Sequence, residues 1–297
     1  GIRDTSVTGV QTCALPIHEL GAQMSSIYLK EDGTEFLWQK DPDYWKSSAP
    51  VPFPIIGKLN NMETLFDGEK YSMKSNGIIR YEIIPVVEKQ DSFVEFLFTN
   101  TEDTKKMYPF DCRVKIRYEL IDNKLIVTTH IMNDDNKTMY FNYAGHPGFR
   151  TPLYDNETCN DYYIEFEKNE RVGVFALSDS GQLLPETVPF FENENKFFIR
   201  KDLFMKEALG FRHPVSNSVS IKSITNSHEV KLNFEGFDNL AIWSPYVQDK
   251  DLKFVCLEPW VGHSDYMGNV GEFKNRDEVA SLEAGQCKEY TYTIEIK

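Results

Sequence analysis

The chain has 297 residues, a formal net charge of −14 and 41% hydrophobic residues, so it has enough apolar material for a large core. Because nucleic-acid binding relies on grouped Lys and Arg and the sequence has no basic cluster, we expect no nucleic-acid partner. No apolar run approaches the ~20 residues of a membrane helix, so we also expect no membrane association.

The first seventeen residues, GIRDTSVTGVQTCALPI, lack an initiator Met, a basic segment and a long apolar segment, so they do not read as a signal peptide. We interpret residues 1–17 as a non-native tail of the kind that read-through of a sequencing adapter would add. An ordinary disordered tail is the alternative. Residues 18–297 are then expected to form a single domain.

From residue 18 onward the sequence has the periodicity of β-strands. Apolar and polar residues alternate, with many Val, Ile, Tyr, Phe and Thr, over residues 92–100, 112–121, 124–134, 138–146, 218–225, 229–237 and 289–297. The turn in LIDNKL (120–125) predicts a hairpin. Only 186–196 and 201–209 could hold helical turns. The sequence therefore predicts an all-β fold, an antiparallel sandwich or barrel, and excludes a doubly wound α/β fold.

The stretch YAGHPGFR (143–150) places a histidine at the end of an apolar strand. We expect Pro147 to hold His146 in extended backbone and Gly145 to remove a side chain that would block a ligand. These features suit a histidine that faces a ligand, but this stretch alone does not favour that role over a core histidine with its hydrogen bonds satisfied.

A second stretch, FVCLEPWVGHSDY (254–266), ends an apolar strand with a carboxylate. Apolar surroundings would raise the pKa of Glu258 and make it a better base, and an indole such as Trp260 beside a carboxylate is common in sugar sites. A glutamate that caps a turn is the alternative. His146 and Glu258 lie 112 residues apart (258 minus 146), each before a proline, and together they are a more specific signal than either alone.

The cysteines give no motif. Cys13, Cys112, Cys159, Cys256 and Cys287 are odd in number and scattered, with no CxxC, so the spacing predicts neither a disulfide framework nor a metal site. A reducing, cytoplasmic setting fits this pattern.

Several segments together resemble the aldose 1-epimerases (mutarotases), in particular a bacterial LacX-like branch. They are LGAQMSSIYLKEDGTEFLWQKDPDYW, APVPFPIIGKLNN, YPFDCRVKIRYEL, NYAGHPGFRTPL, KDLFMKEALGF, LAIWSP and VCLEPWVGHSD. The GHPxF and CxEPW elements are the specific ones. The resemblance covers residues 18–297 and implies a galactose-mutarotase-like β-sandwich with a sugar cleft on a concave sheet. It also implies that His146 is the general acid and Glu258 the general base.

The chain departs from the family pattern at three positions. Asn76 replaces a second active-site histidine, Lys58 replaces an arginine, and Glu207 stands where the family has a shorter acidic residue. An Asn cannot carry a proton at neutral pH, and Lys offers one point charge where Arg offers a planar fork. The expected substrate-binding residues are Lys58, Asn76, Arg80, Glu207, Trp243 and Trp260.

The residue types suit anomer interconversion, in which one group removes the proton of the C1 hydroxyl and another protonates the ring oxygen, without metal or cofactor. A nearby carboxylate is expected to keep His146 protonated near neutral pH. We therefore predict an aldose 1-epimerase with a small-molecule sugar substrate, monomeric or weakly dimeric. A non-catalytic sugar-binding or sensing protein and a hexose-phosphate 1-epimerase stay open. We expect Trp38 and Trp45 to be packing residues, whereas Arg150 could lie at the surface or contact the sugar, and His263 could line the cleft.

Overall fold

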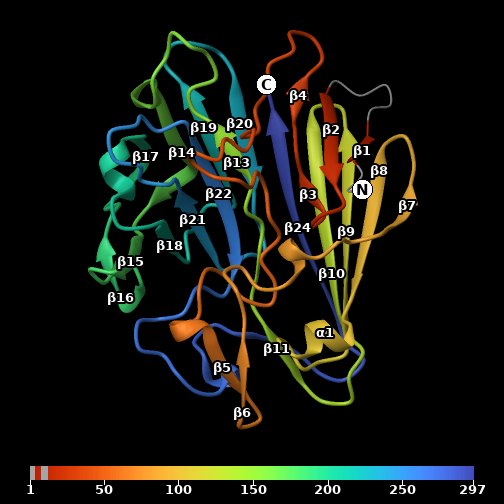
Figure 1. Ribbon diagram of the computed structural model, residues 1–297. Helices are drawn as coiled ribbons and strands as arrows, with labels where there is room; N and C mark the ends of the chain where they lie inside the picture. Colours follow the sequence, from red (N-terminus) through yellow and green to blue (C-terminus); the bar gives the residue numbers. More distant parts are fainter. Residues whose placement is uncertain (1–3, 8–12) are drawn as a thin grey trace.

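The computed structural model describes residues 4–7 and 13–297, and two antiparallel sheets dominate it (Figure 1). The larger sheet has nine strands, in spatial order β17 (Glu194–Phe198), β14 (Tyr162–Glu170), β19 (Ser218–Ser223), β20 (Glu229–Asn233), β24 (Cys287–Ile296), β10 (Lys124–Asn133), β9 (Cys112–Ile121), β8 (Phe93–Thr99) and β7 (Val86–Lys89). The second sheet has seven strands, in the order β12 (Tyr143–Ala144), β22 (Phe254–Val261), β21 (Asn239–Trp243), β18 (Leu209–Arg212), β15 (Gly173–Leu177) and β16 (Leu183–Pro189), with β13 (Gly148–Arg150) also paired to β22.

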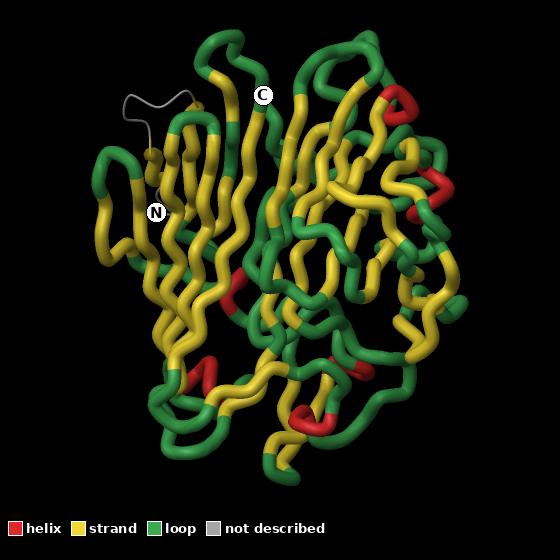
Figure 2. The backbone as a smooth tube through the Cα atoms, turned by 180° about the vertical axis from the view of Figure 1, so that it is seen from behind, coloured by secondary structure: helices red, strands yellow, loops and turns green. Residues whose placement is uncertain are grey.

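Smaller elements surround these sheets. Four short strands form a third sheet: β1 (Asp4–Val7), β2 (Cys13–His18), β3 (Gln23–Met24) and β4 (Tyr28–Leu29). Two ribbons pair β5 (Glu63–Phe66) with β6 (Glu69–Ser72) and β11 (Met139–Phe141) with β23 (Ala280–Leu282). The helical segments lie in connections between strands (Figure 2): α1 (Glu102–Lys105) and 3-10 turns at Asn60–Met62, Ile79–Tyr81, Cys159–Asp161, Lys201–Phe204 and Phe273–Asn275.

The predicted all-β fold is confirmed. One hydrophobic core takes buried side chains from both large sheets, for example Leu257 of β22 and Tyr292 of β24, so the sheets pack as a sandwich. The LIDNKL hairpin is confirmed as well, because Ile121 pairs with Lys124 and Asp122 takes the left-handed backbone that such a tight turn requires.

One expected helical segment is wrong. Residues 186–196 contribute to the strands β16 and β17, because the β-branched Thr187 and Val188 pair with β15. Within 201–209 a single 3-10 turn forms at Lys201–Phe204, as expected. The turn α1 was missed, since its signal is a short capping box between Thr101 and Thr104.

The described part of the N-terminal segment is strand. In β2, Leu15 and Ile17 are buried in the main core. Residues 1–3 and 8–12 of the expected tail lie outside the described residues. The non-native origin of residues 1–17 stays a prediction, and we retain as a proposal that residues 18–297 form one domain. Among the described residues, no helix combines the length and apolarity needed to cross a membrane.

The strand β22 is buried on both faces, and this positions the site. Alternate side chains of a strand point to opposite faces. Val255 and Leu257 therefore enter the main core, whereas Cys256 and Trp260 belong to separate apolar clusters on the other face. Glu258 lies between them, on the face that points away from the main core.

Candidate active site

His146 and Glu258 form a cross-strand pair. His146 lies in the short connection between β12 and β13, and both of these strands pair with β22 in one unbroken antiparallel register. The flanking hydrogen bonds run from the Gly145 N–H to the Pro259 carbonyl (3.1 Å) and from the Leu257 N–H to the Pro147 carbonyl (3.2 Å). They make His146 and Glu258 a non-hydrogen-bonded pair, the type in which opposite side chains approach most closely. The His146 Nε2 lies 3.3 Å from the Glu258 Oε1.

The two prolines sit symmetrically beside this pair. Pro147 lies opposite Leu257, and Pro259 lies opposite Gly145, so each flanking pair keeps one of its two possible ladder hydrogen bonds. Proline has no N–H to supply the second. The X-Pro pattern on both strands therefore limits the sheet pairing around His146 and Glu258 while fixing the backbone of these two residues in extended conformation.

The expected reason for Gly145 is wrong. A Cβ on this residue would lie 2.8 Å from the ring of Tyr292 and 3.2 Å from Pro259. Both contacts are internal packing, and Tyr292 belongs to the main core. The glycine lets the sheet edge pack on this ring and does not clear a path for a ligand.

A cavity of about 380 Å³ lies over the pair, within the range of ~300–1,000 Å³ typical of small-molecule sites. The structure brings together in its lining all eight residues that the sequence singled out: Lys58, Asn76, Arg80, His146, Glu207, Trp243, Glu258 and Trp260. These residues come from loops and strands that are spread over some two hundred positions of the sequence, and the fold brings them together at one cavity.

Burial sets the protonation of the pair. The side chains of His146 and Glu258 are 10% and 5% exposed. Burial, and next the charge of Arg80, lower the pKa of His146 to about 3. Burial raises the pKa of Glu258 to about 8. The hydrogen bond that the Trp260 N–H donates to Glu258 (3.1 Å) opposes this rise, and the charge of Glu207 adds to it. The expectation of an imidazolium near neutral pH is therefore wrong: the pair holds one proton, and it lies on Glu258.

Aromatic rings enclose His146. Trp45 stacks on its ring with a centroid distance of 5.1 Å, and Trp243 meets it edge-on at 5.8 Å. Trp45 lines the cavity, so the expectation that it only packs is wrong. Its loop has no periodic pattern, and the residue's place in the DPDYW segment was the one available signal. Trp38 does pack, stacked on Phe254.

Charged groups line the rest of the cavity. Burial raises the pKa of Glu207, and a hydrogen bond from Trp243 and the charge of Lys58 oppose that shift. Arg80 donates to the Ser47 Oγ (3.0 Å), and in the described part of the chain it has no carboxylate partner. Burial lowers the pKa of Arg80; the guanidinium nevertheless remains charged at neutral pH.

Asn76 serves the backbone of a cavity loop. It has the left-handed φ of 62°, and its Oδ1 accepts the Gly57 N–H at 2.7 Å. The next residue, Gly77, is also left-handed, and a Cβ there would lie 2.1 Å from the Phe53 carbonyl oxygen. Asparagine tolerates this backbone better than most residues. Asn76 therefore shapes the loop as well as lining the cavity.

We expect Asn76→Ala to destabilise the fold more than Asn76→Gly. Both variants leave the Gly57 N–H without its acceptor, a loss of about 1–3 kcal/mol. Alanine adds the cost of left-handed backbone, about 1–2 kcal/mol, which glycine does not incur. Urea unfolding of the two variants and the wild type would measure this difference. Equal free energies of unfolding for the two variants would show that the backbone at position 76 is unstrained.

Two further residues lie outside the cavity lining. Arg150 donates to the backbone carbonyls of Glu35 and Leu153, so it supports a loop. His263 is buried against Phe175 and Tyr266, and its Nδ1 contacts the Ser264 carbonyl oxygen at 2.7 Å. Neither residue supports the possibility of a sugar contact that the sequence left open.

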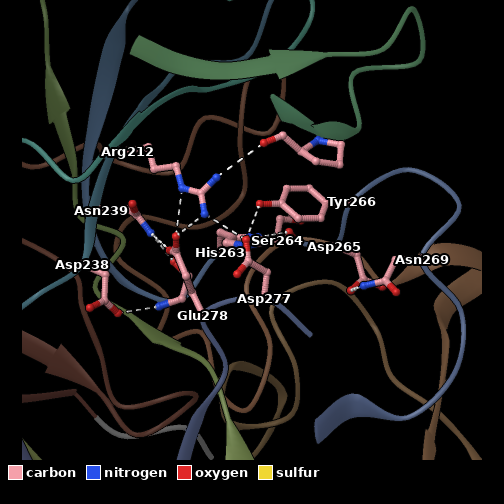
Figure 3. Close-up of polar contacts among 12 residues, drawn as sticks. Arg212, Asp238, Asn239, His263, Ser264, Asp265, Tyr266, Asn269, Asp277 and Glu278 are labelled. Atoms are coloured by element: carbon pink, nitrogen blue, oxygen red, sulfur yellow. Dashed lines mark hydrogen bonds and ion pairs between the residues drawn. The ribbon is translucent and has the colours of Figure 1, made fainter. Parts of the chain in front are cut away.

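His263 belongs to a polar cluster that anchors a cavity loop (Figure 3). In it Arg212 contacts the carboxylates of Asp277 (2.9 Å) and Glu278 (2.7 Å). A second anchor is the buried ion pair of Asp265 with Arg276, at 2.6 Å. Asp265 lines the cavity, as do Ser264 and Gln182. Sequence reasoning missed these three residues, because they follow no strand pattern.

Comparisons with known proteins agree with this geometry. The model of the aldose 1-epimerase family matches residues 6–277. Two curated relatives from Lactococcus lactis subsp. lactis, the plasmid and chromosomal forms of "Protein LacX", are 30% identical over 286 residues, 93% of this chain and 94% of theirs.

Solved structures agree as well. A galactose mutarotase related enzyme from Lactobacillus acidophilus is 26% identical with a TM-score of 0.92, covering 99% of this chain and 97% of its own. A galactose mutarotase-like protein from Lactobacillus casei ATCC 334 is 26% identical with a TM-score of 0.89, covering all of both chains. With the sandwich fold and the family model matched over nearly its whole length, this chain belongs to the aldose 1-epimerase family.

Proposed function

We propose that the chain is an aldose 1-epimerase that interconverts the α and β anomers of a hexose or related aldose. The observation that carries the proposal is the buried pair of His146 and Glu258, 3.3 Å apart at a cavity of sugar-sized dimensions. The indoles of Trp45, Trp243 and Trp260 offer apolar walls for the faces of a sugar ring. The polar and charged lining residues offer partners for its hydroxyls.

The reaction needs one proton removed and one delivered. Glu258 takes the proton of the C1 hydroxyl while His146 gives a proton to the ring oxygen. The bond from C1 to the ring oxygen breaks, and C1 becomes an aldehyde carbon. Rotation about the C1–C2 bond exposes the other face of the aldehyde, and the same proton transfers in reverse close the ring as the other anomer.

The single proton on the pair fits this cycle. Ring opening starts with the proton on His146 and ends with it on Glu258, so both arrangements have the same proton count. The pKa values, about 3 for His146 and about 8 for Glu258, place the proton on Glu258 in the free protein. The free protein is thus already in the protonation state that follows ring opening. A bound sugar has to shift the proton to His146 by hydrogen bonding both groups.

Two positioned proton-transfer groups can account for useful acceleration. Each such group contributes about 10²–10⁴-fold in rate. The second requirement is orientation, and the paired strands supply it, because His146 and Glu258 are held by backbone hydrogen bonds on either side. In this mechanism, His146 and Glu258 make all the proton transfers.

A phosphorylated aldose is the second candidate substrate. Lys58 and Arg80 both line the cavity, and Arg80 has no carboxylate partner among the described residues. Either cation could bind a phosphate. The carboxylates of Glu207 and Asp265 in the same lining oppose an anionic ligand. We therefore favour a neutral sugar.

The proposal extends to the setting of the protein. We propose that it works in the cytoplasm as a monomer or weak homodimer, without a nucleic-acid or membrane partner. A net charge of −14 supports the absence of a nucleic-acid partner. The free thiols of Cys112, Cys159, Cys256 and Cys287 suit a reducing compartment.

Polarimetry of freshly dissolved α-anomers tests the function directly. We expect the protein to accelerate mutarotation of at least one free hexose above the buffer rate, and to act on the matching 6-phosphate more slowly. Faster turnover of the 6-phosphate would favour the second candidate. If no sugar is accelerated but calorimetry detects binding, the enzyme proposal is wrong and the chain is a sugar-binding protein.

A further inference from the structure

The acid–base chemistry leaves one member of the CxEPW element without a role, Cys256. It precedes Glu258 by two residues on β22, so both side chains point to the same face. A ring nitrogen of His146, the thiol sulfur of Cys256 and a carboxylate oxygen of Glu258 all lie within 4.8 Å of one another. All three residues are buried. Strand pairing has collected three strong metal-ligand types at one point.

The spacing of these atoms is close to that of a metal site. Zinc binds nitrogen and oxygen at ~2.0–2.2 Å and sulfur at ~2.3 Å, which places neighbouring ligands of a tetrahedral site roughly 3.5 Å apart. The His146 Nε2 and Glu258 Oε1 are 3.3 Å apart. The sulfur lies at most 4.8 Å from its partners. Side-chain rotations that move the atoms by about 1 Å would complete the geometry.

The surroundings of the thiol are packed on one side and support an ion on the other. Gly148 pairs with Cys256, and a Cβ on Gly148 would lie 3.2–3.3 Å from Phe254, Trp45 and the thiol sulfur, so an ion would have to lie on the side of His146 and Glu258. The Trp260 N–H binds the Glu258 Oε2 and leaves the Oε1 directed at His146. Such outer hydrogen bonds orient ligands in metal sites. The fourth coordination position would face the cavity that His146 and Glu258 line.

The ligand types select the ion. A thiolate, an imidazole and a carboxylate suit a borderline-soft cation such as Zn²⁺, whereas Mg²⁺ and Ca²⁺ prefer oxygen ligands. The expectation of no zinc motif came from local cysteine spacing. These ligands escape such a search because Cys256 and His146 lie 110 residues apart (256 minus 146).

We propose that His146, Cys256 and Glu258 form a binding site for a thiophilic divalent cation, Zn²⁺ foremost, and that the bound ion blocks sugar turnover. The ion takes the lone pairs of His146 and Glu258, and it releases to solvent both the proton that Glu258 carries below about pH 8 and the thiol proton of Cys256. Proton transfer to and from the sugar then stops. The inhibition rests on the proposed function, whereas the metal binding does not.

A second group of potential metal ligands differs in one respect from the site at Cys256. His263, Asp277 and Glu278 also offer atoms within 4.8 Å of one another. The guanidinium of Arg212 already lies within 2.9 Å of both carboxylates, as Figure 3 shows. A cation there would have to displace a bound positive charge. Among the described residues, no Lys or Arg forms an ion pair with Glu258, and Arg80, whose charge lowers the pKa of His146, donates to Ser47.

The test uses the purified full chain with Zn²⁺ and with Cd²⁺ as a spectroscopic probe. We expect calorimetry to detect one Zn²⁺ per chain and Cd²⁺ to produce the ultraviolet charge-transfer band of a metal-bound thiolate. Cys256→Ser should remove the band and weaken Zn²⁺ binding at least about tenfold. Cys159→Ser, at another buried cysteine, is the matched control and should change neither. Circular dichroism checks that both variants fold.

Polarimetry adds the functional readout, with each variant compared with its own zinc-free rate. Zn²⁺ should inhibit the wild type reversibly, with recovery on addition of EDTA, and should inhibit Cys256→Ser only at about tenfold higher concentration or above. No Zn²⁺ binding, or binding unaffected by Cys256→Ser, would overturn the proposed site. Binding with the thiolate band but without any effect on turnover would overturn the inhibition alone. Metal binding to a protein that mutarotates no sugar would contradict the proposed function and leave the metal site standing.

Discussion

Glu258→Gln is expected to lower kcat for mutarotation by about 10²–10⁴-fold, because an amide cannot accept the C1 hydroxyl proton. The amide has nearly the shape of the carboxyl group, and its oxygen can still accept the Trp260 N–H. Sugar affinity measured by calorimetry should therefore change little. Polarimetry across a range of sugar concentrations separates kcat from KM. A variant with wild-type kcat would remove Glu258 from the mechanism.

The pH dependence supplies the control for that result. Above the pKa of Glu258, about 8, the pair loses its single proton and no acid remains for the ring oxygen. Below the pKa of His146, about 3, the pair holds two protons and no base remains. For the wild type we expect kcat/KM to be level between these limits and to fall on the alkaline side near pH 8. The residual activity of Glu258→Gln should lack this alkaline fall. A fall that persists in the variant would assign it to another group.

Glu207→Gln is the matched control within the same cavity. It makes the same chemical change at a carboxyl group that lines the site but does not contact His146 in the described structure. We expect a change mainly in KM, since removal of a sugar-binding contact that is equally strong in ground and transition states leaves kcat unchanged. The contrast with Glu258→Gln distinguishes proton transfer from binding.

The sheet architecture was predictable from the sequence because most strands bury one face. In β9 and β10, alternate side chains are buried in the sandwich core, so apolar and polar residues alternate along the sequence. Such alternation predicts both the strand and which of its two faces is buried. The segment 186–196 misled because the end of β16 is exposed at consecutive positions, Val188 included, so its burial does not alternate. The alternation begins again only in β17, where exposed and half-buried positions follow one another.

The positions of His146 and Glu258, the proposed acid and base, were predictable for a different reason. Each precedes a proline, and that local constraint is visible in the sequence without knowledge of the fold. Their direct opposition was not visible, since it depends on the register of β12, β13 and β22. Their protonation was not visible either, because it depends on how deeply both side chains are buried. Desolvation reverses the expected ionic state.

The loops were the least predictable part of the site. Trp45, Gln182 and Asp265 line the cavity from segments without strand periodicity. Each is placed by contacts with residues distant in the sequence: Trp45 stacks on His146, Asp265 accepts the Asn60 N–H at 3.2 Å, and Gln182 donates to the Asn60 side chain at 2.8 Å. A single sequence gives no signal for such contacts. Lys58, Asn76, Arg80 and Glu207 also lie outside strands, and they were found through the family resemblance. Loop residues therefore need a resemblance or the structure, whereas those at strand ends can be found from the pattern.

His146→Gln is expected to lower kcat by about 10²–10⁴-fold, because glutamine cannot donate and regain the proton that the ring oxygen needs. The decisive measurement is the double variant with Glu258→Gln. When two groups act as one unit, loss of either removes most of the acceleration, so the double variant should be no more than about tenfold slower than the slower single variant. Losses that multiply would mean that His146 and Glu258 act independently.

The stability of the same variants tests the protonation state of the pair. Removing one partner of a buried ion pair leaves an unpaired buried charge, which costs about 3–5 kcal/mol. The pair described here is neutral below the pKa of Glu258, so neither Glu258→Gln nor His146→Gln should strand a charge at pH 7. We expect both single variants to lose less than about 2 kcal/mol in urea unfolding. A loss in the ion-pair range in both would mean that the proton lies on His146 in the empty site, so that the enzyme would start from the imidazolium.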